Sequence, residues 1–318
     1  MSIDERAQLQ AERGALQGIL ANIPEEDVLD RGSFLGRLGD VERRLAGVAA
    51  DSRAPARARL TFRGRPVVDG HGIFADFGMS ATKAFADAVS MMAAATTAPL
   101  APTGPIPNHD RNQLLVTSTA VGSFGFELEE YRGDQLALEE ETPVSIALGQ
   151  AQELLQGVRG TDEELADAAT VTDPRAVAAV RSFLETLVSS EAVCALEFRE
   201  RSVSFADVGE VRRSVARLGH DNLREEEQRL EGAFQGVLPR RRQFEFKLAA
   251  SDDVITGDVI TGTLGPSIAD PDSLNAHLHE LARIRVTALR VGSGRPRYVL
   301  SAPPEWLGSE RLPRPESV

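Results

Sequence analysis

Lysine is nearly absent from this chain, which limits the chemistry that its side chains can perform. Of the 35 Lys and Arg residues, only Lys83 and Lys247 are lysines. Lysine is the basic residue whose pKa falls on burial for Schiff-base or general-base catalysis, whereas arginine stays charged. Lys83 ends a Ser80-Ala-Thr-Lys83 stretch, the S-x-x-K spacing of serine acyl-enzymes. No partner motif of that chemistry accompanies it, and Ser80 is explained more simply as the N-cap of a helix that begins near it.

The histidines show no spacing typical of a metal site. His71 and His109 lie in turn-like segments with aspartates beside them, and with Ser80 they would form a hydrolase site only if the three segments converge. His277 and His279 are two positions apart, so on a helix they would point about 200° apart and could not share one metal. We therefore predict no metal site and no cofactor, and we keep a hydrolase near His71, Ser80 and His109 as an alternative.

Six arginines lie at two predicted turns near the C-terminus, where guanidinium groups suit phosphate or carboxylate groups. They are Arg240, Arg241, Arg242, Arg290, Arg295 and Arg297. Residues 228–300 carry ten Lys and Arg against eight Asp and Glu, whereas the chain as a whole has a net charge of −13. These arginines are the candidate surface for an anion or a partner, and a solvated basic face is the alternative. Few aromatic residues are near enough to stack on bases, chiefly Phe244, Phe246 and Tyr298, so nucleic acid is not the favoured ligand.

Residues 1–50 predict a helical hairpin. Two apolar stripes recur at helical spacing, and the segment Pro24-Glu25-Glu26-Asp27 separates them. A pair of such short helices would be marginal alone in water. We therefore expect the hairpin to pack on the rest of the chain, or to form a coiled coil with a second copy or a partner. Residues 1–48 are the predicted site of self-association or of protein binding.

Residues 56–222 predict an α+β body with a helical middle. Runs rich in β-formers lie at 59–62, 67–68, 114–119, 124–128, 195–198 and 203–205. Helix starts are marked by Thr142-Pro143, by the capping box Thr161-x-x-Glu164 and by Asp173-Pro174. A further helix is expected from about Ser80 and another after Asp207. These signals predict structure and indicate no chemistry.

Residues 226–302 predict a small β-barrel. Alternating apolar runs at 244–248, 285–289 and 297–300, together with glycines where strands bend, indicate five short strands. One helix is expected after Asp270-Pro271. Such a set is typical of a barrel of the SH3-like or OB-like kind. Residues 303–318 are predicted to be a loose tail, and the fold class is α+β and multidomain, with the hairpin, the body and the barrel in that order.

Composition and charge limit the function further. The chain is 42% hydrophobic and 26% charged, as is ordinary for a globular protein, and no apolar run approaches the roughly 20 residues that span a bilayer. One cysteine, Cys194, allows no internal disulfide, and the acidic balance disfavours general coating of nucleic acid. We predict a non-enzymatic interaction or assembly protein of a bacterial cytoplasm, an accessory subunit or regulator of a multi-protein system. It would be a homo-oligomer or bind a protein partner, without a membrane; a nucleic-acid-binding module using the arginine turns is an alternative.

Overall fold

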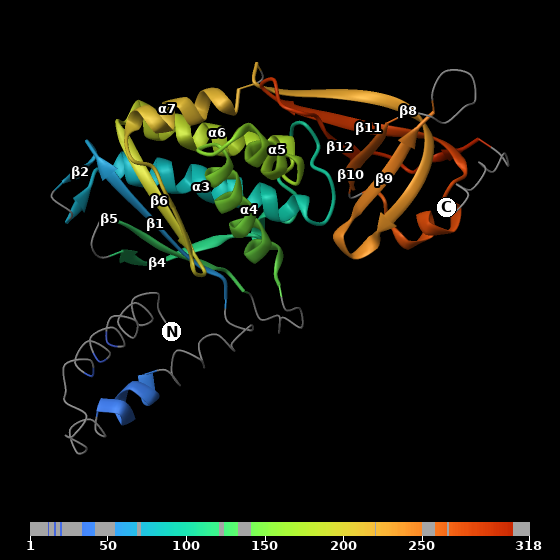
Figure 1. Cartoon of the computed structure of the whole chain (residues 1–318). Helices are drawn as coiled ribbons and strands as arrows, with labels where there is room; N and C mark the ends of the chain where they lie inside the picture. The colour runs from blue at the N-terminus through green and yellow to red at the C-terminus, as the bar shows by residue number, and fades with distance from the viewer. Residues whose placement is uncertain are drawn as a thin grey trace.

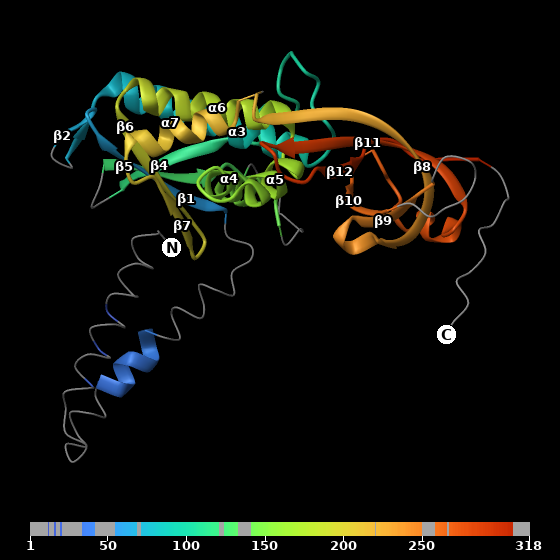
Figure 2. The same ribbon diagram turned by 45° about the horizontal axis from the view of Figure 1, so that its top comes forward.

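The computed structural model describes Glu12, Leu16, Leu20 and residues 34–41, 55–68, 71–120, 124–132, 141–219, 221–249, 258–265 and 267–307. Figures 1 and 2 show a body of sheet and helices beside a β-barrel, with two long strands joining them. The predicted hairpin of residues 1–50 lies largely outside the described residues and stays a prediction. Within it, Leu16 and Val41 are buried together against Phe34 and Leu38.

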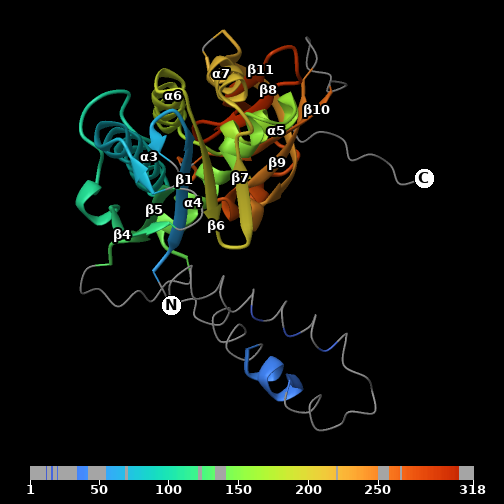
Figure 3. The ribbon, with the colours of Figure 1, turned by 90° about the vertical axis from the view of Figure 1, so that its left-hand side faces the viewer.

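The body is built on a five-stranded antiparallel sheet with the order β4-β5-β1-β6-β7, which Figure 3 shows from one side. Its strands are β1 (Arg57–Gly64), β4 (Leu114–Ala120), β5 (Phe124–Glu130), β6 (Ala192–Phe198) and β7 (Arg201–Ser204). Successive side chains of a strand point to opposite faces, and Ala58, Leu60 and Phe62 of β1 are fully buried. A short hairpin, β2 (Val67–Val68) and β3 (Gly72–Ile73), follows β1.

Helices cover one face of this sheet (Figure 1). They are α3 (Ala75–Ala95), α4 (Pro143–Gly157), α5 (Asp162–Thr170), α6 (Pro174–Ser189) and α7 (Val208–Arg217). Edge-to-face contacts fix the packing, with ring centroids 5.2 Å apart for Phe62 and Phe77 and 5.5 Å apart for Phe85 and Phe183. None of the helices described is long and apolar enough to cross a membrane.

Three helix starts confirm the sequence prediction. The Thr142 hydroxyl accepts the Ser145 N–H at α4, and the Asp173 carboxylate accepts the Arg175 N–H at α6. The capping box that begins at Thr161 is complete at α5. These signals are local, because the cap and the N–H that it satisfies lie within three residues of each other.

The start of α3 was predicted wrongly. The helix begins at Ala75 and not near Ser80, so Ser80 lies inside it and donates its hydroxyl to the Asp76 carbonyl at 2.7 Å. Ser80 is therefore not an N-cap. Lys83 forms an ion pair with Asp87 one turn further on, so both residues of the S-x-x-K stretch bind partners on their own helix.

The C-terminal part forms a closed barrel of five strands. They are β8 (Leu223–Leu238), β9 (Gln243–Leu248), β10 (Val259–Leu264), β11 (Leu281–Val291) and β12 (Arg297–Leu300). The ring order is β8-β9-β10-β12-β11, and it closes where β11 pairs with β8. Strands β10 and β12 are parallel, and the other neighbours are antiparallel. Phe234 makes edge-to-face contacts with Phe244 and Phe246 in its core.

Short elements complete the barrel. The turn after β8 is a 3-10 helix, η2 (Pro239–Arg241), and the helix predicted after Asp270-Pro271 is the 3-10 helix η3 (Asp272–His277). A two-residue strand, β13 (Glu305–Trp306), pairs with β11. The structure differs here from the prediction of a loose tail from residue 303, because Trp306 packs against the barrel core.

Strands β8 and β11 serve two cores at once. Ile284 and Val286 of β11 are buried in the barrel core. Leu289 and Val291, which have the opposite parity along the strand, are buried in the body core instead. Leu223 at the start of β8 pairs with Val291 and packs against the same body core. The ribbon of β8 and β11 therefore ties the barrel to the helices of the body.

Candidate functional site

A groove of about 700 Å³ lies between α4, α5 and β7, and we call it the β7 groove. Its lining comprises Gln152, Glu153, Gln156 and Gly157 of α4, Glu164, Asp167, Ala168 and Val171 of α5 and its C-terminal cap, and Arg201, Ser202 and Val203 of β7. Its volume falls in the range of roughly 300–1,000 Å³ that is usual for ligand sites.

One wall of the β7 groove is the edge of the body sheet. Leu196 of β6 pairs with Val203, and β7 is the last strand in the order, so its other side pairs with no strand among the described residues. Figure 3 shows β7 outside β6, at the end of the sheet opposite β4. An edge strand presents a row of N–H and C=O groups to which an extended peptide can add.

Helix α4 holds this edge in place. The buried Gln152 amide donates to the Arg201 carbonyl at 2.8 Å. Glu153 forms an ion pair with the Arg201 side chain at 3.5 Å, and both side chains are more than half exposed. Exposed pairs of this kind contribute about 0–1 kcal/mol to stability. The Arg201 backbone is thus fixed, whereas its side chain and that of Glu153 can exchange partners at little cost.

The lining is acidic with an aliphatic strip. Glu153, Glu164 and Asp167 face one lining cation, Arg201. The Glu164 carboxylate accepts the Thr161 N–H at 2.7 Å within the capping box, which holds it at the rim. The aliphatic strip consists of Ala168, Val171 and Val203, and the Val171 residue is 51% exposed. The groove therefore offers carboxylates and a small apolar surface next to a strand edge.

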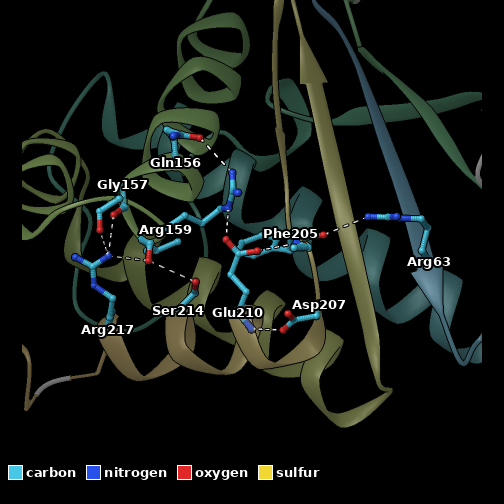
Figure 4. A network of polar contacts seen from close by, with 12 residues as sticks. Arg63, Gln156, Gly157, Arg159, Phe205, Asp207, Glu210, Ser214 and Arg217 are labelled. Carbon is cyan, nitrogen blue, oxygen red and sulfur yellow. Dashed lines mark hydrogen bonds and ion pairs between the residues drawn. The ribbon is translucent and has the colours of Figure 1, made fainter.

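A network of polar contacts fixes the end of α4 behind the groove (Figure 4). Arg217 of α7 donates to the carbonyl oxygens of Val158 at 2.9 Å and Gly160 at 2.6 Å, and to the Asp162 carboxylate at 2.8 Å. The last carbonyls of a helix have no partner within the helix and carry its negative dipole end. Arg217 supplies both a donor and a positive charge there, so α7 sets the position of the connection from α4 to α5.

Glu210 extends this network on the same face of α7. It accepts hydrogen bonds from Arg159 Nε at 2.7 Å and from the Ala206 N–H at 2.6 Å. Burial raises the pKa of the Glu210 carboxyl, but these two hydrogen bonds and the charge of Arg159 outweigh it, so the pKa lies below its usual value. Glu210 is therefore held as a carboxylate.

No known protein family, curated protein or solved structure matches this chain. The β7 groove is consequently interpreted from its geometry. Its lining includes one hydroxyl, that of Ser202, and no histidine or cysteine.

The structure does not bring the two groups of predicted arginines together. The η2 turn follows the C-terminal end of β8, whereas the turn from β11 to β12 lies at its N-terminal end, where Val291 pairs with Leu223. β8 has 16 residues, so the two turns lie at opposite ends of a long strand. Figure 1 shows β8 starting beside α7 of the body and running into the barrel.

Two of the six arginines have partners that fix them. Arg242 adopts a left-handed backbone (φ 49°) and donates to the carbonyl oxygens of Gly265 at 2.6 Å and Ile268 at 2.9 Å, which closes one end of the barrel. Arg297 donates to the Asp167 carboxylate at 2.6 Å, at the rim of the β7 groove. The remaining four are exposed: Arg240, Arg241, Arg290 and Arg295.

His109 lies far from His71 and Ser80, so the three residues of the hydrolase alternative do not converge. His71 is in the turn before β3, at the N-terminal end of α3, and His109 is in η1 (His109–Arg111), beyond the loop that follows its C-terminal end. A helix of 21 residues such as α3 is about 30 Å long. Figures 1 and 2 show β2 and the loop after α3 at opposite ends of the body.

The C-terminal histidines have structural partners. His277 stacks on Trp306 with ring centroids 4.5 Å apart and shares a hydrogen bond of 2.9 Å with Glu280. The His279 N–H donates to the Phe234 carbonyl at 3.0 Å. Within the part of the chain that the structure describes, no group of three or more His, Cys, Asp or Glu could hold a metal ion.

The β7 groove has no signal in the local sequence. The run 203–205 and the capping box of α5 predict two separate elements, and both are present. Nothing in the local sequence shows that 201–204 is the last strand of a sheet or that α5 lies beside it. Both facts depend on contacts between segments far apart in the chain.

Proposed function

We propose that this protein is a non-enzymatic interaction or assembly protein that binds an extended segment of a partner protein in the β7 groove. The observation that carries the proposal is the position of the β7 edge as one wall of a groove with acidic and aliphatic lining. A segment added to β7 would pair with its backbone and place every second side chain in the groove. The strand edge would supply affinity, and the groove would supply specificity.

The chemistry of the groove indicates which segment fits. Glu153 and Glu164 favour a basic side chain, and Ala168, Val171 and Val203 favour a small aliphatic one. The net charge of −13 also attracts a basic partner at long range. We therefore propose an extended segment that alternates basic and small apolar residues.

The test uses the tagged full-length chain and two matched variants, purified from cells of the organism that makes it. Val171→Arg places a positive charge and a long side chain in the groove. Ile146→Arg makes the same change at another exposed aliphatic residue, on α4 but outside the groove lining. Co-purifying proteins are quantified by mass spectrometry, and hydrogen exchange of Ser202 and Ser204 is measured with and without the partner.

A partner that co-purifies with the wild type and with Ile146→Arg, is lost with Val171→Arg, and slows exchange at Ser202 and Ser204 would support the proposal. Retention of every partner by Val171→Arg would refute it, as would unchanged exchange along β7. Binding of the chain's own termini would appear as slow exchange at β7 in the purified wild type without any partner.

The strand path of the barrel favours a second candidate function. We propose that the barrel is of the OB-like rather than the SH3-like kind, because β8, β9 and β10 form a meander, β11 returns beside β8, and β12 closes the ring in a Greek-key path. In OB-folds the second and third strands and two loops bind oligonucleotides. Arg240 and Arg241 are exposed in the equivalent first loop.

The buried rings weaken that candidate. Phe244 and Phe246 of β9 are 2% and 0% exposed, so neither can stack on a base. If nucleic acid nevertheless binds, the combined change Arg240→Ala and Arg241→Ala should weaken binding and reduce the slope of log affinity against log salt by about 2. Absence of salt-dependent binding to single-stranded DNA would exclude this candidate.

The self-association or docking predicted for residues 1–48 is a separate proposal, and those residues lie largely outside the described part. A bacterial cytoplasm is the compartment that we propose, on the composition and the single cysteine.

A further inference from the structure

Two arginines lie directly opposite each other on the outer face of the β8–β11 ribbon. Arg229 of β8 pairs in register with Arg285 of β11. The Arg285 carbonyl accepts the Ser301 N–H at 2.9 Å, so the backbone of Arg285 is directed away from β8. The two arginines therefore form a non-hydrogen-bonded pair, the kind with Cα atoms about 4.5 Å apart and close side chains. Like charges directly opposite destabilise a sheet.

A third arginine lies on the same face and is already held. Arg283 donates to the Glu231 carboxylate from Nε at 2.9 Å and from Nη2 at 2.7 Å, and it lies 3.7 Å from Glu305. Two carboxylates thus fix its side chain. Arg283 contributes positive charge at a defined place beside the opposed pair.

The opposed pair itself has little compensation. The nearest carboxylate to Arg285 is that of Glu227, at 4.0 Å, which is the limit of an ion pair. Arg229 has no ion-pair partner among the described residues. The three arginines face three carboxylates, but Glu231 and Glu305 both pair with Arg283, which leaves Arg285 with only the long contact to Glu227 and Arg229 with none among the described residues.

A pocket of about 120 Å³ opens between these side chains. Its walls are the three arginines, Ile284, Glu305 and the segment 302–303. The volume is well below the roughly 300–1,000 Å³ of a site for a whole small molecule. It is several times the roughly 30 Å³ that a water molecule occupies, so it can take one small polyatomic group.

We propose that this pocket binds a single phosphate group, free or carried as the ester of a small molecule, between Arg229 and Arg285. A guanidinium presents a planar fork of donors that matches two oxygens of a phosphate, and the tetrahedral group has enough oxygens for two forks. The bound dianion replaces the repulsion between the two arginines with two charge-assisted contacts. The site is independent of the β7 groove and of the six arginines predicted from the sequence.

The test measures binding of inorganic phosphate to the full chain by titration calorimetry at constant ionic strength, with chloride as the reference. Arg229→Gln removes the guanidinium that has no ion-pair partner among the described residues. The matched control is Arg224→Gln, because Arg224 is an exposed arginine on the same strand and lies opposite Arg290. We expect one phosphate per chain. Affinity should fall about tenfold or more in Arg229→Gln and stay within about twofold in Arg224→Gln.

Thermal unfolding separates a binding role from a structural one. Without phosphate, Arg229→Gln should unfold at the same or a higher temperature than the wild type, because a repulsion is removed. Addition of phosphate should raise the unfolding temperature of the wild type more than that of Arg229→Gln. Lowering of the unfolding temperature by the same amount in both buffers would overturn the proposal, as would unsaturable phosphate binding or equal affinity of Arg229→Gln. Phenyl phosphate identifies the source: binding of it as well indicates an ester, and binding of inorganic phosphate alone indicates the free ion.

Discussion

At the scale of single residues, this protein uses arginine to fix its own backbone. Arg217 and Arg242 each donate to carbonyl oxygens of two or more other residues, and Arg297 joins the barrel to α5 through Asp167. A guanidinium can do this because it has five donors in a rigid plane and remains charged. A lysine ammonium at the same places would reach fewer oxygens.

Glu210 gives a prediction for the dependence of stability on pH. Its pKa is lowered in the folded protein, so its ionised form stabilises the fold above the pKa of the unfolded chain, near 4.5. This contribution is lost as the pH falls from about 5 through the folded pKa. In Glu210→Gln, the loss of stability relative to the wild type should be largest at pH 7 and should shrink below pH 4.5.

Urea unfolding at pH 7, 5 and 4 measures this difference. Glu245→Gln serves as the control, since Glu245 is exposed on β9. A gap between Glu210→Gln and the wild type that stays constant over this range would show that the Glu210 carboxylate is not preferentially stabilised in the fold.

Residue type alone could not show which arginines bind a ligand. Arg242 in the sequence is the third of three consecutive arginines and looks equivalent to Arg240 and Arg241. In the structure it differs from them because its backbone is left-handed and its side chain turns inward to the carbonyls of the loop after β10. The opposed pair Arg229 and Arg285 was not predicted, because 56 positions separate its members and only the register of β8 and β11 brings them together.

At the scale of elements, helix ends decide how well the body could be predicted. The caps at Thr142, Thr161 and Asp173 were found because each satisfies an N–H that lies close in sequence. The start of α3 was missed because Phe74, its N-cap residue, makes no side-chain capping bond. A helix without a polar cap leaves no local signal of where it begins.

The C-terminal end of α4 provides a test of capping by a distant residue. Arg217→Met removes the donors to Val158, Gly160 and Asp162 and leaves the carbonyls at the end of α4 without them. Since hydrogen bonds to charged groups contribute about 1.5–3 kcal/mol, the free energy of unfolding should fall by about 2 kcal/mol. Urea unfolding measures the change.

Arg212→Met is the matched control, because Arg212 is exposed on the same helix. Equal stability of the Arg217 and Arg212 variants would mean that these contacts contribute nothing to the fold. Arg217→Met should also speed hydrogen exchange at Gly157 and Val158 more than elsewhere in α4.

The start of strand β8 could not be predicted from the pattern of apolar residues. The run Glu225-Glu226-Glu227 reads as a solvated segment, yet it lies within β8 and pairs with residues 287–289 of β11. Its backbone takes part in the ladder while its side chains remain exposed. An exposed strand with charged side chains has no alternation to detect. The start of β8 at Leu223 is therefore defined only by its pairing with β11.

At the scale of the whole molecule, the body and the barrel have two cores that share strand β11. Leu289 and Val291 belong to a strand of the barrel and are buried among the helices of the body. Asn222 and Gly292 add a backbone hydrogen bond of 3.0 Å at the same junction. The predicted barrel is present in the C-terminal half, but the sharing of β11 between two cores could not be read from the hydrophobic pattern.

This sharing predicts cooperative unfolding. Leu289→Ala should lower the free energy of unfolding by about 2–4 kcal/mol, as expected for a buried leucine. The wild type should show one thermal transition, and Leu289→Ala should lower the midpoint of that single transition because it loosens the barrel and the body together. Calorimetry and hydrogen exchange of α5 and β12 measure this.

Val259→Ala is the control. Val259 is a barrel residue that is 53% exposed, so its replacement should lower the free energy of unfolding only slightly. Two separate transitions in the wild type, with only one of them sensitive to Leu289→Ala, would show that the parts unfold independently.

The alternation along β11 also constrains which changes of length the chain can tolerate. Ile284 and Val286 occupy even positions and face the barrel, whereas Leu289 and Val291 occupy odd positions and face the body. Inserting or deleting one residue between Val286 and Leu289 would turn every later side chain to the other face, because the period of a strand is two. It would expose leucine and valine and bury Arg290 at the same time. Only insertions or deletions of even length would keep both faces in place, so parity rather than distance sets the permitted spacing between the two halves of the molecule.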